Sequence, residues 1–468
     1  MNMVEFSPRR FRVLFFTLAL PLSAGCTSAA PIAQPPAPAA RPDAVEAHGR
    51  ALSPLDLSGG KIKHVVIIFQ ENRSVDDLFN GLPGADTVKS GLNSTGGKTN
   101  LQPIPLTAPY DLSHSHAAYE IEYDQGLMDG FNLEACNSSK AESDCEKADE
   151  LAYGYVPQSE VAPYFAMAEQ YGFGDRMFQT NEGPSFPAHQ YIVSGTSTVS
   201  DGSTLRASEN PSSAKQRLSG GCDSPKGSLV QLIDENGEEN QLMYPCFHRS
   251  ALPDLIDAAG LSWHYYVAHL GPGLWNGIDA IEHIRKSSEY ATDVVAPSSE
   301  VLTDIANGNL ANVVWVTPTA LASDHAGATN GSGPSWVASV VNAIGESSYW
   351  KSTAIFVTWD DWGGWYDHVK PPVYNSYELG FRVPLVVISA YTDKGYVSHK
   401  QHEFGSILKF TEKTFGLGSL GTTDKRADDL SDFFKFKQKP RKFTPIKSSL
   451  PRSYFLKQPM PMADPDDD

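Results

Sequence analysis

The stretch TAIFVTWDDWGGWYDH, residues 353–368, joins an apolar run to a dense group of acidic residues. The run TAIFVT is rich in β-branched residues, which predicts a strand that is buried on both faces. Asp360 and Asp361 follow this strand directly. Adjacent carboxylates repel each other, and burying either one unpaired is costly. Two interpretations stand: a solvated turn, which Asp and Gly favour, or a site where a cation or a polarised substrate supplies the opposite charge.

Three further apolar runs predict strands, and helical patterns alternate with them. The strands are HVVIIF at 64–69, NVVWVT at 312–317 and PLVVIS at 384–389. The helices are predicted over 250–260, which begins with Ser250 as a cap, 334–344 and 403–415. This alternation predicts an α/β fold, with a mostly parallel central sheet, helices on both faces, and loop and small-subdomain insertions. Ligands of such sheets bind beyond the carboxyl ends of the strands.

Residues 1–26 have the features of an export signal. Three arginines precede the apolar run VLFFTLALPL, which is too short to span a bilayer. The run ends at SAGC, so Cys26 is a candidate for lipidation, and ordinary cleavage near TSAA is the alternative. We therefore expect an exported protein that is periplasmic, anchored to the outer membrane through Cys26, or secreted.

Composition divides the rest of the chain. Residues 27–60 are rich in Ala and Pro, which predicts a linker, and residues 61–440 carry the predicted strands and helices. Within that domain, residues 198–250 are rich in Ser, Gly and Asn, which indicates a surface excursion. Residues 441–468 end in DPDDD and are predicted to form an exposed tail.

Charge and missing motifs exclude several classes of function. The formal net charge of −18 argues against non-specific nucleic-acid binding, which needs a basic surface. The sequence has no G-x-x-x-x-G-K-[ST] loop, and its G-x-G-x-x-G match, GLGSLG at 416–421, follows a predicted helix and not a strand, so nucleotide-cofactor chemistry is not expected. G-x-S-x-G is also absent, which excludes the usual serine-esterase elbow.

Four cysteines remain beyond the export signal, and export makes disulfides plausible. We expect two local pairs, Cys136 with Cys145 and Cys222 with Cys246. A zinc site is the alternative, but no Cys-x-x-Cys spacing supports it.

Polar residues follow the other predicted strands as well. Glu71 and Asn72 come after the first strand, and Asp324 and His325 follow the second after a short loop. Because the carboxyl ends of parallel strands share one edge, we expect these side chains to gather near the two aspartates of 353–368. Such an oxygen-rich set suits a divalent cation and leaves Ca²⁺, Mn²⁺, Mg²⁺ and Zn²⁺ open. Taken singly, each residue favours a helix cap or a solvated loop, and the agreement of three strand ends shifts the balance toward a site.

A candidate nucleophile lies in NEGPSFPAHQYIVSGTS, residues 181–197. Ser185 is flanked by Pro184 and Pro187, which stiffen the turn and remove backbone donors. A rigid turn can fix a hydroxyl against a metal ion, which lowers the pKa of that hydroxyl. Most serines in such loops only form turns, and that alternative stays open.

His114 and His116 are two residues apart in DLSHSHAAYE. On a strand, both side chains would face the same side. They are candidates for metal ligands, phosphate donors or acid catalysts, and a surface loop is the alternative.

These blocks together resemble the bacterial phosphoesterase family that contains phospholipases C and acid phosphatases, a branch of the alkaline phosphatase superfamily. The resemblance is carried by HVVIIFQENRSVDDLFNG, DLSHSHAAYE, GPSFPAHQYIVSGT, SDHAG and WDDWGGWYDHVKPP, among other segments. It spans roughly residues 61–420 and keeps the order of the blocks, which chance matches would not do. It implies an alkaline-phosphatase-like fold with residues 61–440 as the catalytic domain.

The resemblance also implies roles for individual residues. Metal and phosphate ligands would be Glu71, Asn72, Asp360 and Asp361. Ser185 would be the nucleophile, and His114 and His325 would contact the phosphate or the leaving group. Possible supporting residues are His116, Asp324, Asp367, His368 and His189. Two departures stand out: Pro187-Ala188-His189 replaces the usual Pro-Asn-Arg, and Asp76-Asp77 replaces the common Asp-His.

The implied function is that of an exported, metal-dependent phosphoesterase with a phospho-Ser185 intermediate. Its substrate would be the phosphodiester of a phospholipid headgroup, as for a phospholipase C. A phosphomonoester, as for an acid phosphatase, is the alternative. A surface binding protein that kept the fold and lost turnover is an alternative of another class, and only Ala188-His189 supports it. Membrane contact is expected only through Cys26 or a lipid substrate.

Overall fold

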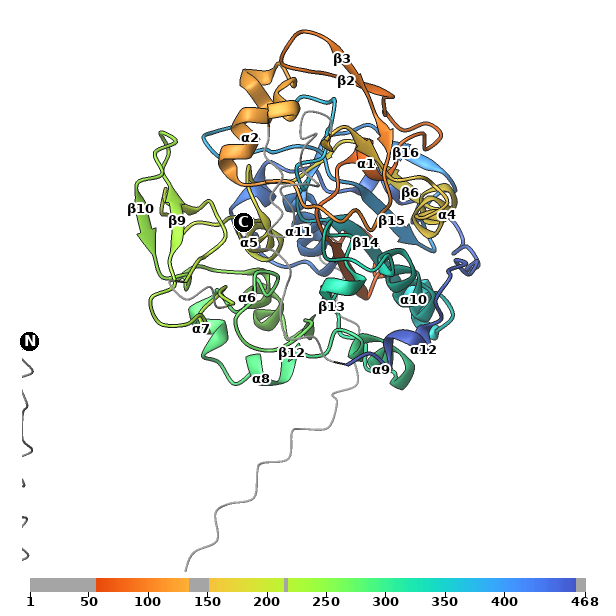
Figure 1. Cartoon of the computed structure of the whole chain (residues 1–468). Helices are drawn as coiled ribbons and strands as arrows, with labels where there is room; N and C mark the ends of the chain where they lie inside the picture. The colour runs from red at the N-terminus through yellow and green to blue at the C-terminus, as the bar shows by residue number, and fades with distance from the viewer. Residues whose placement is uncertain (1–55, 134–150, 214–217, 460–468) are drawn as a thin grey trace, which may run out of the picture. The chain divides into compact units, whose positions relative to one another are not determined.

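Strand β1 (His64–Gln70) lies in the middle of an eight-stranded sheet, and all its residues after His64 are buried. The structure is a computed structural model that describes residues 56–133, 151–213 and 218–459 (Figure 1). β1 pairs in parallel with β13 (Val313–Val316) on one side and with β14 (Thr353–Trp359) on the other. The strand order is β12-β11-β13-β1-β14-β15-β6-β16. Three of the predicted strands therefore lie side by side.

The fourth predicted strand differs from its neighbours in direction. β15 (Leu385–Ser389) is antiparallel to β14 and to β6 (Gly172–Gly174). The other adjacent strands of this sheet pair in parallel: β11 (Trp263–Tyr266), β12 (Val294–Val295) and β16 (Tyr396–Ser398) complete it. The prediction of a mostly parallel sheet is confirmed. An apolar strand buried on both faces does not reveal its direction.

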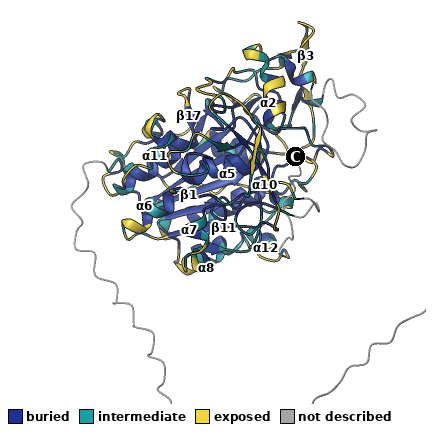
Figure 2. Ribbon diagram, turned by 90° about the vertical axis from the view of Figure 1, so that its left-hand side faces the viewer, coloured by how far each residue is buried: buried dark blue, intermediate teal, exposed yellow. Residues whose placement is uncertain are grey.

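Helices cover both faces of the sheet (Figure 2). On one face α5 (Ser185–Ser194) packs against α6 (Leu252–Ala258) and α11 (Phe404–Phe415). On the other face α10 (Gly333–Gly345) packs against α4 (Ala162–Gln170) and α9 (Glu300–Asn307). The three predicted helices are present. Ser250 is not a cap, because α6 begins after Ala251 and Ser250 bonds to Asp201 instead.

The segment 198–250 forms a small subdomain, which confirms the predicted insertion. Its three-stranded antiparallel sheet contains β8 (Arg206–Ala207), β9 (Val230–Ile233) and β10 (Gln241–Met243). Apolar residues of this sheet pack with Phe186 and Trp275 in a separate cluster. Cys222 and Cys246 form the predicted disulfide. Cys136 and Cys145 lie outside the described residues.

Short elements complete the fold. The helices are α1 (Val75–Leu78), α2 (His116–Tyr123), α7 (Glu282–Arg285), α8 (Tyr290–Asp293) and α12 (Arg452–Phe455). The strands are β2 (Ser90–Leu92), β3 (Lys98–Asn100), β4 (Gln102–Pro103), β5 (Gly154–Tyr155), β7 (Met177–Phe178) and β17 (His402–Glu403). Within the described ranges, no helix is long and apolar enough to cross a membrane.

The C-terminal segment differs from its prediction, and the N-terminal segment lies outside the described residues. Residues 441–459 are not simply an exposed tail, because Ile446 and Phe455 are buried in the core. The ring of Phe455 lies 5.3 Å from that of Trp336 in α10. The predicted export signal and Cys26 lie outside the described residues and remain predictions.

Candidate active site

The ends of β1 and β14 bring four polar residues together. Gln70 pairs with Trp359 at the end of the shared register, so the segments that follow leave the sheet side by side. The Asp360 amide donates to the Gln70 carbonyl at 3.1 Å, and the Asn72 amide donates to Oδ1 of Asp360 at 3.1 Å. The four residues, all fully buried, are Glu71, Asn72, Asp360 and Asp361. The structure thus brings the predicted strand-end residues to one edge.

Buried acceptors at this edge fit a cation. Oδ1 of Asn72 and Oδ2 of Asp360 receive no hydrogen bond from any described residue. Leaving such oxygens buried without a positive partner is costly. The ligand atoms of Glu71, His189 and Asp360 lie within 4.8 Å of one another, and all three residues are buried. Carboxylate, amide and imidazole donors at this spacing are a suitable set for a divalent cation.

Two glycines let the acidic loop pack tightly on its neighbours. Gly363 and Gly364 have φ angles of 63° and 72°, in the left-handed region where glycine is unstrained. A Cβ at Gly363 would lie 2.4 Å from the Asn72 carbonyl oxygen, and one at Gly364 would lie 2.4 Å from Cβ of Leu112. The close neighbours of both glycines are therefore protein atoms of the first strand-end segment and of the loop before His114.

Ser185 begins α5, so it lies at a helix N-terminus where a rigid turn was expected. Its hydroxyl donates to Oδ2 of Asp361 at 3.1 Å, and Oδ1 of Asp361 accepts from the Gly363 amide at 2.8 Å. Pro187 falls in the first helical turn, where an amide hydrogen is not needed. The positive end of the helix dipole favours negative charge at this hydroxyl or on a bound phosphate.

His114 and His325 lie together, with ring centroids 6.0 Å apart. Each Nδ1 faces a backbone carbonyl, of Leu112 at 2.8 Å and of Ala326 at 2.7 Å. Because a carbonyl only accepts, Nδ1 carries a proton in both rings. Nε2 of His114 accepts from the Asn72 amide group at 3.1 Å. Nε2 of His325 has no hydrogen-bond partner in the described part of the chain.

His116 diverges from His114, because the two histidines are not on a strand. His116 is the first residue of α2, which Ser115 caps by accepting from the Ala118 amide at 3.2 Å. Its ring lies 3.2 Å from Glu239 and 4.0 Å from Glu182. Burial raises the pKa of Glu182 well above its usual range. The two histidines therefore do not share one face of a strand.

Asp324 lies beside the end of β14 and does not join the strand-end residues. Its Oδ2 accepts from the Tyr164 hydroxyl at 2.8 Å and from the Trp359 indole at 3.0 Å. Burial raises the pKa of this carboxyl to about 7, although these hydrogen bonds and Arg73 oppose the shift. Arg73 also donates to the Asp324 carbonyl at 2.9 Å. Asp324 thereby fastens the segment before His325 to the end of β14.

Asp367 and His368 belong to a second buried cluster. Arg382 makes two hydrogen bonds to Asp367, at 2.8 and 3.0 Å. Nδ1 of His368 lies 2.6 Å from Oδ2 of Asp76, which also lies 3.5 Å from Arg382. These contacts anchor the end of the acidic loop to α1, so Asp367 and His368 position this loop. Among the described residues, neither side chain bonds to the strand-end residues.

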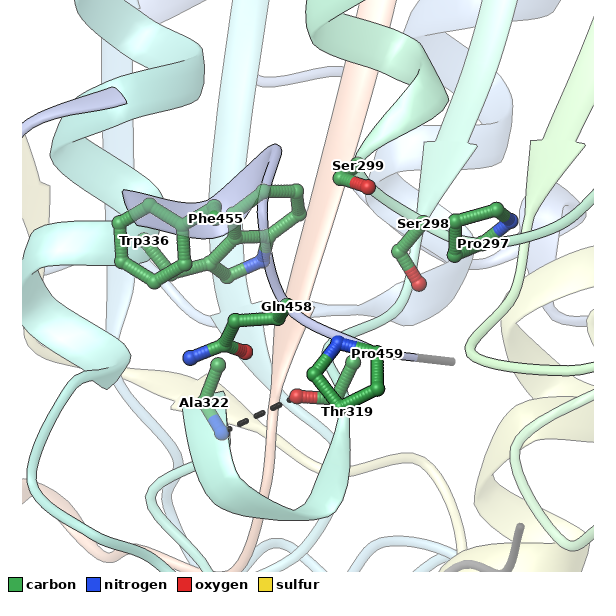
Figure 3. A pocket seen from close by; sticks show the side chains of 9 residues that line it. All are labelled: Pro297, Ser298, Ser299, Thr319, Ala322, Trp336, Phe455, Gln458 and Pro459. Carbon is green, nitrogen blue, oxygen red and sulfur yellow. Dashed lines mark hydrogen bonds between the residues drawn. The ribbon is translucent and has the colours of Figure 1, made fainter. Parts of the chain in front are cut away.

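A separate pocket lies beside α10 and α12 (Figure 3). Its lining is made of apolar and neutral polar residues: Pro297, Ser298, Ser299, Thr319, Ala322, Trp336, Phe455, Gln458 and Pro459. None of them is ionisable, and none is a candidate residue. The strand ends, and not this pocket, therefore remain the candidate active site.

Comparison with known proteins finds one matching family and several relatives of similar sequence. The model of the Phosphoesterase family matches residues 62–418. Non-hemolytic phospholipase C of Pseudomonas aeruginosa is 24% identical over 429 residues, which cover 80% of this chain and only 57% of that relative. Non-specific phospholipase C1 of Arabidopsis thaliana is 25% identical over 443 residues (83% and 74%), and phospholipase C B of Mycobacterium tuberculosis is 23% identical over 450 residues (82% and 80%). Among solved structures, a protein in the alkaline phosphatase superfamily from Vibrio parahaemolyticus aligns with a TM-score of 0.35, 11% identity, and coverage of 80% of this chain and 70% of that chain.

Proposed function

Since the chain belongs to the Phosphoesterase family and is therefore a phosphoester hydrolase, we propose that it cleaves phospholipid headgroup phosphodiesters like a phospholipase C. The observation that carries the proposal is the buried Ser185 hydroxyl, held 3.1 Å from Asp361 at the strand ends. The phospholipase C names of three relatives support the substrate class.

The chain's own residues fit a divalent cation. Oxygen ligands would come from Glu71, Asn72, Asp360 and Asp361, which are fully buried at one sheet edge. The two acceptors without a hydrogen bond, on Asn72 and Asp360, support this assignment. When bound, the cation supplies Lewis acidity and neutralises the adjacent carboxylates.

Ser185 attacks phosphorus in line, so an Oγ–phosphorus bond forms as the bond to the leaving alcohol breaks. Asp361 accepts the hydrogen bond of this hydroxyl and takes its proton as the new bond forms, and the N-terminus of α5 favours the negative charge of the bound phosphate. A water molecule then attacks phosphorus and gives a proton to the histidine that protonated the leaving alcohol, while Ser185 leaves and regains its proton from Asp361.

His325 is the better candidate for protonating the leaving oxygen. Its Nε2 has no hydrogen-bond partner in the described residues, so it can carry a proton to the substrate. Nε2 of His114 is engaged with Asn72, which makes His114 a positioning residue. The geometry supports this division of roles, and substitution of each histidine tests it.

One assay separates the candidate functions. Purified protein is given phosphatidylcholine vesicles, p-nitrophenyl phosphorylcholine and p-nitrophenyl phosphate. We expect both diesters to show higher kcat/KM than the monoester. A preference for the monoester would identify an acid phosphatase and contradict the substrate class. Absence of turnover with all three would favour the binding protein.

Substitution of the nucleophile has a matched control on the same helix. Ser185→Ala should lower kcat by about 10³-fold or more, because the attacking oxygen is lost. Ser194, at the other end of α5, is equally buried, and its hydroxyl has no hydrogen-bond partner in the described residues. Ser194→Ala should therefore stay near wild-type activity. Equal activity of the two variants would exclude Ser185 as the nucleophile.

A further inference from the structure

His189 stands at the strand ends, although the sequence suggested only a possible supporting role for it. We propose that His189 is a nitrogen ligand of the cation, and that this ligand shifts the site's preference from Ca²⁺ and Mg²⁺ toward transition-metal ions such as Zn²⁺. The inference rests on the proposed metal-dependent function and deepens it.

The helix α5 explains why His189 reaches the site. His189 lies four residues after Ser185, so both side chains project from the same face of this helix. That face is fully buried against the strand ends, with both residues at 0% exposure. The nucleophile and the imidazole are therefore positioned by one rigid element.

The distances at Nε2 suit an intervening cation. Nε2 of His189 lies 3.5 Å from Oε1 of Glu71 and 3.8 Å from Oδ2 of Asp360. Two ligand atoms bound to one tetrahedral ion at about 2.1 Å are about 3.4 Å apart. A charge-assisted hydrogen bond between an imidazolium and a carboxylate would be shorter, at about 2.7–2.9 Å. The spacing therefore favours a shared cation over a direct ion pair.

The protonation of His189 is fixed by its other neighbour. The Tyr265 hydroxyl donates to the Trp275 carbonyl at 2.9 Å and lies 3.5 Å from Nδ1 of His189. Because its single hydrogen is used on Trp275, the Tyr265 oxygen faces Nδ1 as an acceptor. Nδ1 then carries the proton, and Nε2 offers its lone pair toward Glu71 and Asp360. Such an orienting contact is typical of histidine ligands.

An imidazole changes which ion the site prefers. Ca²⁺ and Mg²⁺ favour sites made of oxygen ligands, whereas imidazole suits Zn²⁺ and other transition-metal ions. The remaining ligand atoms at the strand ends are all oxygens, so His189 alone supplies this selectivity among the candidate ligands.

X-ray absorption at the zinc edge tests the ligand directly. Full-length protein is freed of metal with a chelator, reloaded with one equivalent of Zn²⁺, and measured. We expect the multiple-scattering signature of one imidazole. A spectrum with oxygen ligands only would overturn the inference, and this measurement on the unaltered chain does not depend on any variant folding.

Variants and affinities give a second readout. His189→Gln should remove the imidazole signature and raise the Kd for Zn²⁺ by about 10–100-fold or more, while the Kd for Ca²⁺ changes little. His283→Gln is the matched control, since His283 also contacts a carboxylate, Asp254 at 2.7 Å, but lies in α7 and belongs to no part of the proposed site. It should leave both constants unchanged. An imidazole signature that survives in His189→Gln would overturn the inference alone, whereas failure to bind either ion would overturn the metal-dependent function itself.

Discussion

Two buried clusters, each with carboxylates and a histidine, are neutralised in different ways. The strand-end cluster consists of Glu71, His189 and Asp360. The arginine cluster consists of Asp76, Asp367, His368 and Arg382. Arg382 supplies a permanent positive charge to the second. Among the described residues, no arginine or lysine pairs with Asp360, and Nε2 of His189 lies 3.8 Å from its Oδ2. Residue types alone do not make a metal site; what decides is whether the protein itself supplies the positive charge.

The largest expected effect separates the two clusters by metal content. Asp360→Asn removes a charged ligand and should lower bound metal and reduce kcat by about 10³-fold or more. Asp367→Asn should retain its metal, because Asp367 pairs with Arg382. Elemental analysis and turnover on the same samples measure both. Two results would contradict this difference between the clusters: folded Asp367→Asn protein that lacks metal, or an active Asp360→Asn variant that keeps it.

Removing the internal cation should destabilise the fold. Arg382→Met leaves Asp76 and Asp367 buried without their partner and should cost about 3–5 kcal/mol in the free energy of unfolding. Arg176 pairs with the partly exposed Asp86 at 2.8 Å, so Arg176→Met should cost about 1 kcal/mol or less. Urea unfolding measures both. Equal stability of the two variants would show that Arg382 does not hold its cluster together.

The buried carboxyl of Asp324 accepts hydrogen bonds from two neutral donors, and its pKa tests whether such donors keep it ionised. Its pKa is about 7 in the folded chain against an ordinary value of 3.8. Between these values the folded state keeps a proton that the unfolded state has lost, so stability falls as pH rises. Asp324→Asn should remove this slope, a difference on the order of 2 kcal/mol between pH 5 and 7. Urea unfolding at both pH values measures it, and parallel curves for wild type and variant would contradict the assignment.

The smallest effect concerns the loop that carries the two aspartates. Gly363 and Gly81 both have left-handed φ angles, of 63° and 79°. A Cβ at Gly81 meets no atom within 4 Å, whereas one at Gly363 meets Asn72. Gly363→Ala should therefore cost about 1 kcal/mol more than Gly81→Ala and should also weaken metal binding. If both variants had the same free energy of unfolding and the same metal affinity, the packing role of Gly363 would be contradicted.

The fold was largely predictable because its central strands are short, continuous apolar runs that alternate with helical patterns. The same runs placed Asp360, Glu71 and Asn72 at one sheet edge, since strand ends converge in parallel sheets. The direction of β15 was not predictable, because a strand buried on both faces has the same composition either way. The burial of Ile446 and Phe455 was also missed, since they follow no helical or strand period.

The rest of the site depends on packing between distant segments. Arg382 follows Asp76 by some three hundred positions, and no local pattern pairs them. The two-residue spacing of His114 and His116 would fit a strand, but it gave no sign of the helix that begins at His116. His189 had a usable signal: its spacing of four from Ser185 places both on one helical face, once a helix start at Ser185 is recognised.

The position of a bound ion shows directly whether the cation binds at the strand ends or in the arginine cluster. Crystals of the full chain soaked with Zn²⁺ would be measured at the zinc absorption edge, and an anomalous difference map would be calculated. We expect an anomalous peak within bonding distance of Glu71, His189 and Asp360, and none among Asp76, Asp367 and His368. A peak in the arginine cluster, or strand ends without a peak at saturating Zn²⁺, would contradict it.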